Sequence, residues 1–291
     1  MNWPRGCRAK AEYSLKDKTT FKIGGCAQFF SEPEDLTELK FLLGAAKKNK
    51  LPVFVLGAGS NLLISDKGVK GLVIKLNSAY FKKVALKGSC LEAGSGVTLN
   101  QLIKFAQTKS LAGLEFLAGI PGTLGGALTM NAGCWESAIG DLVKEVGVMD
   151  YSGRIKILGS KEIKFSYRKS SLEKYIILSA LLGLKKSSRR QIQKNISKYL
   201  MFRRKAQDLS RPNAGCIFRN PPQRYAGKLI DLCGLKGRRS GGAFVSERHA
   251  NFILNLSKAS AKDVLGLMRI IKKKVKDKFK ITLQPEIKIW A

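Results

Sequence analysis

The stretch Gly119–Gly133 constrains this chain more than any other. It contains five glycines and one proline and no charged side chain. Because glycine has no Cβ, the backbone here can approach a partner closely and adopt positive φ at little cost. Such a loop presents backbone N–H groups that suit phosphate, and Thr123, Thr129 and Asn131 add polar side chains. Taken alone, the stretch leaves two interpretations open: a phosphate-binding loop, or a turn with a buried helix after it.

A second glycine segment follows a buried strand. The run Pro52–Ile64 combines that strand, a glycine turn and another apolar run. Gly57 and Gly59 match the start of the Gly-x-Gly-x-x-Gly dinucleotide motif, but Leu62 occupies the third glycine position and no long helix follows. The sequence therefore argues against a Rossmann fold. Two interpretations remain here too: a phosphate-contacting turn, or a tight turn between strands.

The net charge raises the question of a nucleic-acid partner. The chain has 53 Lys and Arg against 21 Asp and Glu, which gives a formal charge of +32 over 291 residues. A surplus of this size is typical of nucleic-acid-binding proteins. The basic residues, however, occur in short clusters along the whole chain, and no RNP, zinc-finger or basic-zipper pattern is present. We therefore expect no nucleic-acid partner, and attraction of an anionic small substrate or an unusual host interior accounts for the charge equally well.

Cysteine and histidine usage argues against a metal site or a disulfide scaffold. The six cysteines are widely spaced without a Cys-x-x-Cys pair, and there is one histidine. The N-terminus lacks the apolar core of a secretory signal, and the uncharged residues 116–135 contain too many glycines for a membrane span. We expect a reduced, soluble, cytoplasmic protein.

Local patterns predict a mixed α+β chain. Leucines spaced from Leu36 predict a helix capped by Ser31 or Asp35, the former with Pro33 at an early helical position. Thr98 is expected to cap a second helix, and Ser260 with Asp263 forms a capping-box pattern for a long C-terminal one. Further helices are expected around Ile192–Leu200 and over Ala226–Cys233. Strands are expected over 19–25, 71–76, 175–184 and 283–290, strands with turns over 84–97, and two strands around the turn Tyr151–Gly153 within 141–157.

Five segments in order resemble one family. They are Thr20-Phe-Lys-Ile-Gly-Gly25, Leu56-Gly-Ala-Gly-Ser-Asn-Leu-Leu63, Gly119–Gly126 with Asn131–Gly133, Ala214-Gly-Cys-Ile-Phe-Arg-Asn-Pro221, and Gly241–Phe252. The chain resembles the UDP-N-acetylenolpyruvoylglucosamine reductases, the MurB flavoenzymes, from about Thr19 to Trp290. No long insertion separates Ile217 from Gly242, and in this respect the chain resembles the shorter class of the family.

The resemblance implies a fold, cofactors and a reaction. The fold is α+β, with an FAD-binding region of the PCMH or vanillyl-alcohol-oxidase type and then a smaller α+β substrate-binding domain. The implied division is an N-terminal extension at 1–18, an FAD domain at 19–186 with subdomains at about 19–78 and 79–186, and a substrate domain at 187–291. The implied reaction uses non-covalent FAD and NADPH to reduce UDP-N-acetylglucosamine enolpyruvate to UDP-N-acetylmuramate in peptidoglycan precursor synthesis, and we expect a monomer.

Three residues match the family's catalytic positions. Cys216 stands where serine is more usual as proton donor, and a thiol still carries a transferable proton at a much lower pKa than a hydroxyl. Arg168 matches the arginine that stabilises the enolate, where a cation is needed for the developing charge. Glu286 matches the second catalytic residue, and partial burial would favour its protonated form.

The resemblance also implies binding residues. Arg219 and Asn220 are expected to contact substrate, although lysine is more usual at 219, and either Arg203 or Arg204 is a candidate for the substrate phosphates. The lone histidine, His249, is open to a structural or a substrate-contacting role. The predicted FAD contacts are Gly57, Gly59, Ser60, Asn61, Gly119, Pro121, Gly122, Thr123, Gly125, Gly126, Asn131, Ala132 and Gly133.

Two other functions compete with this one. Another PCMH-type flavin oxidoreductase would act on an alcohol or lactone, but those enzymes often tether flavin through histidine, and residues 1–248 contain none. A basic nucleic-acid-binding protein is the remaining alternative. Bound flavin would exclude a nucleic-acid-binding protein. NADPH consumption that depends on the enolpyruvyl nucleotide would exclude an oxidoreductase that acts on an alcohol or lactone.

Overall fold

The computed structural model describes residues 8–135 and 137–291, and its contacts divide the chain into two compact units. Unit 1 comprises Met1–Ala11, Phe29–Ala58 and Lys70–Phe202. Unit 2 comprises Glu12–Gln28, Gly59–Val69 and Arg203–Ala291. The first seven residues of the predicted N-terminal extension, with Cys7, lie outside the described part of the chain.

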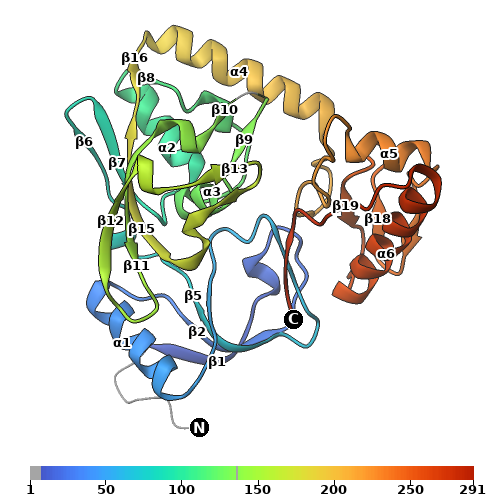
Figure 1. The fold of residues 1–291 in the computed structure, drawn as a ribbon, viewed down its shortest axis with the longest axis horizontal. Helices are drawn as coiled ribbons and strands as arrows, with labels where there is room; N and C mark the ends of the chain where they lie inside the picture. The colour runs from blue at the N-terminus through green and yellow to red at the C-terminus, as the bar shows by residue number, and fades with distance from the viewer. Residues whose placement is uncertain (1–7, 136) are drawn as a thin grey trace. The chain divides into compact units, whose positions relative to one another are not determined.

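A five-stranded antiparallel sheet forms the centre of unit 1 (Figure 1). In sheet order its strands are β12 (Ile155–Gly159), β11 (Val143–Met149), β15 (Ile176–Gly183), β7 (Cys90–Gly94) and β6 (Val84–Lys87). β11 and β12 form the hairpin predicted around Tyr151, and β15 pairs with both β11 and β7. The predicted strands at 84–97, 141–157 and 175–184 are therefore confirmed, with shorter bounds.

Two helices pack on this sheet and close the larger core. α2 (Leu99–Thr108) begins after Thr98, whose hydroxyl accepts the Gln101 amide in a capping box, so the predicted cap is confirmed. α3 (Leu124–Thr129) contacts β15 and β7. Leu102, Leu128 and Val146 are fully buried in the core that these elements share. The same core positions the loop that contains α3.

A second sheet and α1 build the rest of unit 1. The sheet order is β1 (Ala9–Ser14), β2 (Cys26–Ser31), β5 (Val69–Ile74) and β3 (Val53–Val55), and β3 runs parallel to β5. α1 (Leu36–Lys48) packs its leucines into this core and is capped by Asp35, which accepts the Glu38 amide. Of the two predicted caps, Asp35 is therefore correct, and Pro33 precedes the helix instead of lying in its first turn.

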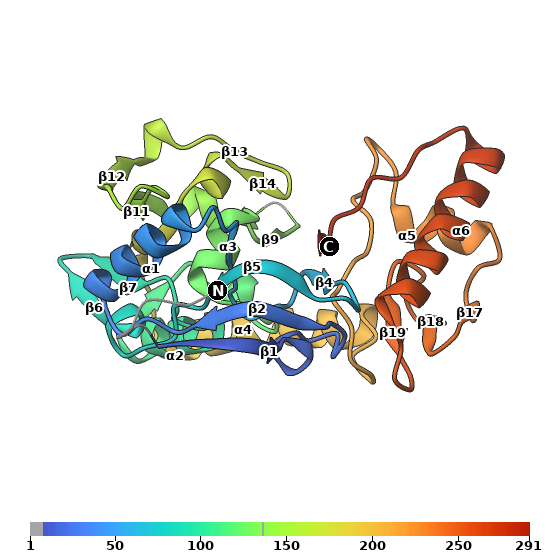
Figure 2. The same cartoon turned by 90° about the horizontal axis from the view of Figure 1, so that it is seen from below.

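Unit 2 combines two helices with short strands (Figure 2). Its elements are α5 (Ala226–Leu232), α6 (Ala261–Phe279), the three-stranded sheet β17 (Arg239–Ser240), β18 (Ala243–Val245) and β19 (Ile253–Asn255), and the parallel pair β4 (Leu62–Ile64) and β20 (Lys288–Trp290). The Ser260–Asp263 capping box at α6 is confirmed. Of the strand predicted over 283–290, only Lys288–Trp290 is regular.

The strand predicted over Thr19–Gly25 is wrong. The Thr19 hydroxyl donates to the Ile23 carbonyl and the Lys22 amide donates to the Thr19 carbonyl, so the segment closes into turns. Lys22 also has a φ of 57°, which a strand does not allow. The regular strand starts after the two glycines.

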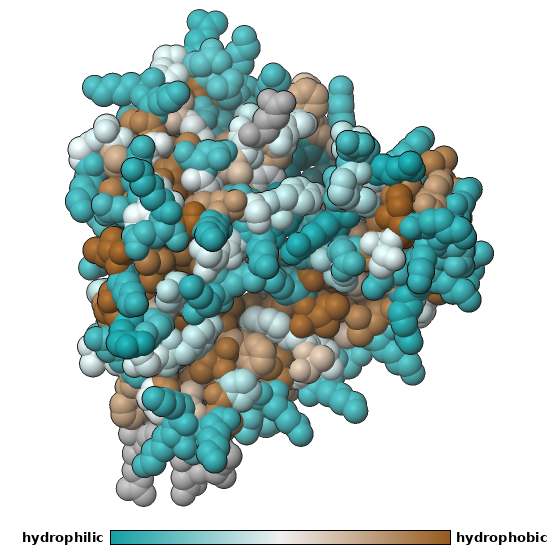
Figure 3. Space-filling model, in the orientation of Figure 1, coloured by the Kyte–Doolittle hydropathy of each residue, from teal (hydrophilic) through white to brown (hydrophobic). Residues whose placement is uncertain are grey.

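The remaining elements are one long helix and three small strand pairs. These are α4 (Arg189–Ala206), β8 (Leu111–Ala112) with β16 (Lys185–Lys186), β9 (Gly133–Cys134) with β10 (Ser137–Ala138), and β13 (Phe165–Ser166) with β14 (Lys169–Ser170). No helix in the described part of the chain is long and apolar enough to cross a membrane. Hydrophilic residues are spread widely over the face shown in Figure 3 instead of forming one patch.

Candidate active site

Within unit 1, Gly57 of the second glycine segment lies beside Thr123 of the first. Gly57 follows β3, and Thr123 caps α3 by accepting the Gly126 amide. A Cβ on Gly57 would lie 2.8 Å from the Thr123 hydroxyl oxygen. The turn after β3 and the Gly119–Gly133 stretch therefore form one continuous surface, although 66 residues of sequence separate Gly57 from Thr123.

The glycine-rich stretch contains a short helix, and this changes which amides can meet a ligand. The Leu124 and Gly125 amides donate to the Val97 and Ser95 carbonyls at 2.8 and 2.9 Å. A Cβ on Gly125 would lie 3.0 Å from that of Ser95. The Gly125 amide is thus committed inside the protein, and the glycine allows α3 to pack closely. For the Gly122 and Thr123 amides, the described residues provide no acceptor.

The turn from Gly57 to Asn61 presents five successive backbone amides. None of the five has a protein acceptor among the residues that the structure describes. Gly59 has a φ of +63°, and a Cβ there would lie 2.3 Å from the Lys18 carbonyl oxygen, so only glycine fits. A run of unpaired amides at a bend is a suitable cradle for phosphate oxygens.

Asn61 is held by the Glu286–Lys288 segment. Its side-chain amide donates to the Glu286 carbonyl at 3.2 Å, and its own carbonyl accepts the Lys288 amide at 2.9 Å. Both contacts accompany the parallel pairing of β4 with β20. The backbone amide of Asn61 has no acceptor among the described residues, so it remains for a cofactor.

Arg168 lies next to the predicted flavin segment of unit 1. It occupies the two-residue turn between β13 and β14 with a φ of 56°, which is uncommon for a side chain with a Cβ. Its guanidinium donates to the Gly133 carbonyl at 2.9 Å. Asn131 braces the same loop, since its side chain donates to the Ser166 carbonyl and accepts the Gly140 amide. Strained backbone of this kind is often found at functional sites.

In unit 2, Cys216 and Glu286 are carried by neighbouring extended segments. The Glu286 amide donates to the Ile217 carbonyl at 2.8 Å, and the Arg219 amide donates to the Gln284 carbonyl at 2.9 Å. Both Cys216 and Glu286 are partly exposed. The segments that carry the two residues predicted to be catalytic, 70 positions apart in sequence, are therefore paired through the backbone.

His249 lies three residues before Phe252, which forms a β-bridge with Cys216. Its Nδ1 accepts the Asn251 backbone amide at 3.3 Å, and its ring packs on Phe252 with centroids 4.7 Å apart. Burial lowers the pKa of His249, which favours the neutral imidazole. These contacts favour the structural interpretation of this histidine.

The predicted substrate contacts differ in their surroundings. Arg203 and Arg204 occupy the last turn of α4, the first half-buried and the second exposed. Asn220 caps α5, because its side-chain oxygen accepts the Ala226 amide at 3.0 Å. Its NH₂ group remains the part of Asn220 that can contact a ligand.

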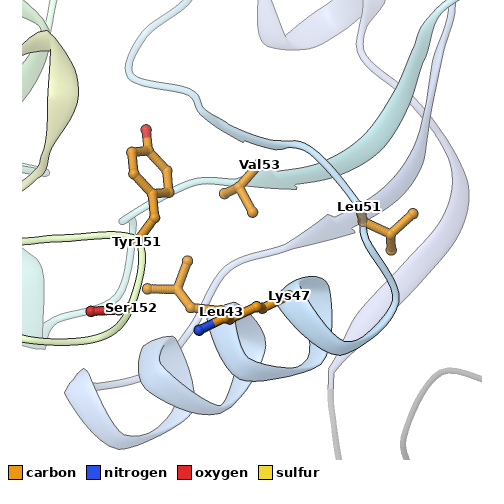
Figure 4. Close-up of a pocket in the computed structure, with 6 residues that line it drawn as sticks. All are labelled: Leu43, Lys47, Leu51, Val53, Tyr151 and Ser152. Atoms are coloured by element: carbon orange, nitrogen blue, oxygen red, sulfur yellow. The ribbon is translucent and has the colours of Figure 1, made fainter.

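An open cavity of about 460 Å³ lies away from all of these residues (Figure 4). It is lined by Leu43, Lys47, Leu51, Val53, Tyr151 and Ser152. None of the predicted site residues lines it, so it is not the predicted flavin site. Among the described residues there is no group of three or more His, Cys, Asp or Glu side chains that could hold a metal ion, and none of the five described cysteines forms a disulfide.

Comparison with known proteins identifies the family. The profile of the FAD binding domain family matches residues 27–159, and that of the UDP-N-acetylenolpyruvoylglucosamine reductase C-terminal domain matches residues 207–290. The reductase of Caldanaerobacter subterraneus subsp. tengcongensis is 44% identical over 277 residues, which cover 94% of this chain and 91% of that one. The chain belongs to the UDP-N-acetylenolpyruvoylglucosamine reductase family.

Further reductases of this family agree. The second such reductase of Symbiobacterium thermophilum is 42% identical, with 98% of this chain and 92% of that one covered. The crystal structure of MurB from Thermus caldophilus matches with a TM-score of 0.84 and 38% identity over 98% of each chain. The predicted order of an FAD-binding region and a reductase C-terminal domain is confirmed, as is the α+β class, and the length of 291 residues agrees with the shorter class.

Two polar residues of this MurB-family site, Asn251 and Ser246, have no prediction from the sequence. Both are buried polar residues within the Gly241–Phe252 motif. The one signal in the sequence is a polar residue inside an apolar run, and it does not show which distant residues that side chain bonds. Local sequence patterns therefore do not indicate the buried hydrogen bonds around this site.

Proposed function

We propose that this chain reduces the enolpyruvyl ether of UDP-N-acetylglucosamine to UDP-N-acetylmuramate, with NADPH as the reductant. One observation carries the proposal. In a chain with an FAD-binding domain, the reductase C-terminal domain holds a thiol and a carboxyl on paired segments through the hydrogen bond from Glu286 to Ile217. A proton donor beside a second acid is what addition across an electron-poor double bond needs.

FAD, when bound and reduced, would supply the hydride for the terminal carbon of the enolpyruvyl group. The electron pair of the carbon–carbon double bond then moves onto the adjoining carbon and its carboxylate. We assign Arg168 to that negative charge, because a fixed guanidinium stabilises an enolate. We assign Cys216 to the proton: its S–H bond breaks, the new C–H bond forms, and the thiolate recovers a proton from solvent.

We assign Glu286 as the second acid and three further residues to the substrate. Glu286 is half-buried on the segment paired with Ile217 in unit 2. Arg219 and Asn220 lie three and four positions after Cys216, and their polar groups suit the sugar and the diphosphate. Between Arg203 and Arg204 we favour Arg203 for phosphate binding, because its half-buried position leaves it less screened.

Two backbone segments suit the FAD diphosphate. The amides of Gly57–Asn61, Gly122 and Thr123, which have no acceptor in the described part of the chain, are donors of the right kind. Gly119, Pro121, Gly125 and Gly126 shape the second segment, and Asn131, Ala132 and Gly133 continue it along the flavin. We assign these roles to an FAD domain at 19–186 and a substrate domain at 187–291.

We also propose that the protein works as a cytoplasmic monomer without nucleic-acid or membrane partners. Its substrate is a charged nucleotide sugar, and a strongly cationic protein attracts such anions. Light scattering of the purified protein tests the oligomeric state. A mass of twice the chain would overturn that part of the proposal and leave the activity untouched.

One assay tests the activity. The purified protein is expected to carry flavin absorbance, to lose it on anaerobic addition of NADPH, and to regain it on addition of UDP-N-acetylglucosamine enolpyruvate. Steady NADPH consumption should require that nucleotide. A protein that carries flavin and oxidises NADPH equally well without it would contradict the proposal.

A further inference from the structure

The backbone that carries Cys216 has little regular structure of its own. Gly215 precedes it with a φ of +75°, and a Cβ at Gly215 would meet nothing within 4 Å. Cys216 and Phe218 form isolated bridges with Phe252 and Pro285, and neither belongs to a named strand. The thiol therefore depends on a few individual contacts for its position.

Asn251 supplies the most complete of these contacts. It is 2% exposed. Its side-chain oxygen accepts the Phe218 amide at 2.9 Å, and its NH₂ donates to the Phe218 carbonyl at 2.8 Å. Its backbone carbonyl accepts the Ile217 amide at 2.9 Å. One asparagine thus bonds three backbone groups of the two residues that follow Cys216.

Asn251 is itself fixed by a second layer of polar groups. Its amide donates to His249 Nδ1, and the His249 amide donates to the Ser246 hydroxyl oxygen at 3.1 Å. Ser246, fully buried, donates to the Asp208 carboxylate at 2.7 Å. Burial raises the pKa of Asp208, but hydrogen bonds from the Ser210 and Ser246 hydroxyls outweigh it, so the net shift is downward. An ionised Asp208 is the acceptor that this chain of contacts requires.

We propose that Asn251 is a positioning residue that fixes the Cys216 thiol on one face of the substrate carbon. This inference rests on the proposed function, in which Cys216 delivers the proton. A thiol held in one place protonates the planar enolate from one side only, which gives a single configuration at the new centre. A displaced thiol loses rate and lets water protonate either face.

Asn251→Asp is the informative variant. The side chain keeps its shape and its acceptor for the Phe218 amide, but an ionised carboxylate has no donor for the Phe218 carbonyl. A protonated carboxyl restores that donor, and burial favours the protonated form. The structure offers a matched control in Asn255, which is 8% exposed and bonds the Phe21 carbonyl and the Ala259 amide at 3.0 Å each. Asn255→Asp makes the same chemical change away from Cys216.

The holoenzymes are compared by stopped flow, product analysis and thiol labelling. We expect both variants to keep flavin, to melt at lower temperatures and to be reduced by NADPH at the wild-type rate. Asn251→Asp alone should reoxidise about 10²-fold more slowly with the enolpyruvyl nucleotide, yield both configurations at the new centre, and recover rate as the pH is lowered. Iodoacetamide labelling of the Cys216 peptide should change in rate for this variant alone, whatever the activity.

The outcomes separate this inference from the proposed function. Equal losses of rate in both variants with a single product configuration would show that Asn251 is only structural. If the wild-type protein does not reduce the nucleotide, the proposed function fails, while the labelling result still tells whether Asn251 positions the thiol. Should Asn251→Asp not fold, Asn251→Ser, which leaves room for a bridging water, takes its place with the same expected results.

Discussion

The side-chain amide of Asn61 donates a 3.2 Å hydrogen bond to the backbone carbonyl of Glu286, 225 residues later in the sequence. Through this contact, a turn whose five amides have no acceptor among the described residues is joined to a segment that carries a proposed acid. The Glu286 amide in turn donates to the Ile217 carbonyl, next to Cys216. Asn61, Glu286 and the segment that carries Cys216 are therefore joined by a series of hydrogen bonds within unit 2.

Removing the Asn61 side chain should loosen this link without abolishing flavin binding. Asn61→Ala deletes the bond to Glu286 but keeps the backbone amide. We expect a loss of about 1 kcal/mol in the free energy of unfolding, measured by urea denaturation. Turnover should fall roughly ten-fold, since a 1 Å misplacement near the chemistry can cost up to about 10²-fold, while the flavin content stays the same.

A matched control for that variant lies at the end of α1. Asn49 donates from its side chain to the Ala45 carbonyl at 2.8 Å, and it lies in unit 1 away from all proposed site residues. Asn49→Ala should cost a similar amount of stability with unchanged turnover. If both variants lose turnover alike, the Asn61 contact has no special part in positioning Glu286.

The proposed thiol acid gives the reaction a distinctive pH dependence. Cys216→Ala should still allow NADPH to reduce the flavin but slow reoxidation by the enolpyruvyl nucleotide by at least about 10²-fold. A thiolate has no proton to deliver, so reoxidation by the native protein should decline at alkaline pH. Cys216→Ser, whose hydroxyl stays protonated, should remove the decline. Near-normal turnover of Cys216→Ala would exclude Cys216 as the donor.

Gly59 should tolerate no side chain. Gly59→Ala places a Cβ 2.3 Å from the Lys18 carbonyl oxygen in a backbone with φ +63°. We expect a loss of about 2 kcal/mol or more together with a lower flavin-to-protein ratio, read from absorbance after purification. Gly88→Ala is the control, because Gly88 has a φ of +61° and open space around its Cα. Both variants strain a backbone with positive φ. The difference between their losses in the free energy of unfolding therefore measures the steric clash of the new Cβ with the Lys18 carbonyl oxygen.

Residues with a strong local signal were predictable. The caps Asp35, Thr98 and Ser260 combine an N-terminal hydrogen-bonding side chain with a following apolar face, and both signals lie within one helical turn. Thr19–Gly25 misled the prediction because alternating side chains suit a strand, whereas the turn contacts of Thr19 decide the backbone. The alternation of side-chain types along a segment does not show whether a hydrogen bond closes that segment into a turn.

The sequence suggests residues for the candidate site but not the connections among them. Cys216, Glu286 and the glycine turn at Gly57–Asn61 were found from motif resemblance. Their pairing through Ile217 and the contact of Asn61 with Glu286 join segments far apart in sequence, and backbone pairing leaves no mark on residue type. The same is true of Asn251, whose importance comes from the peptide groups it bonds.

His249 should make stability depend on pH in a defined window. Burial lowers its pKa in the folded protein, so below its ordinary value of 6.5 the unfolded chain binds a proton before the folded one does. The stabilisation is therefore fully present above about pH 6.5 and is lost as the pH falls. Because this is the only histidine, the fall of Tm between neutral and mildly acidic pH can be assigned to it.

The test compares Tm against pH for the native protein and for His249→Gln. The amide of glutamine does not titrate in this window, so its curve should be flatter there. A native Tm that rises on acidification, or an equal slope in both proteins, would contradict the assignment.

The parallel pairing of β20 with β4 has a consequence for biosynthesis. β20 ends at Trp290, whose carbonyl accepts the Ser65 amide, so β4 pairs with a strand that is synthesised more than 200 residues later. The edge of β4 that faces β20 therefore stays open while the residues between the two strands are translated. A variant truncated before Lys288 would leave that edge exposed, where it could pair with other chains instead.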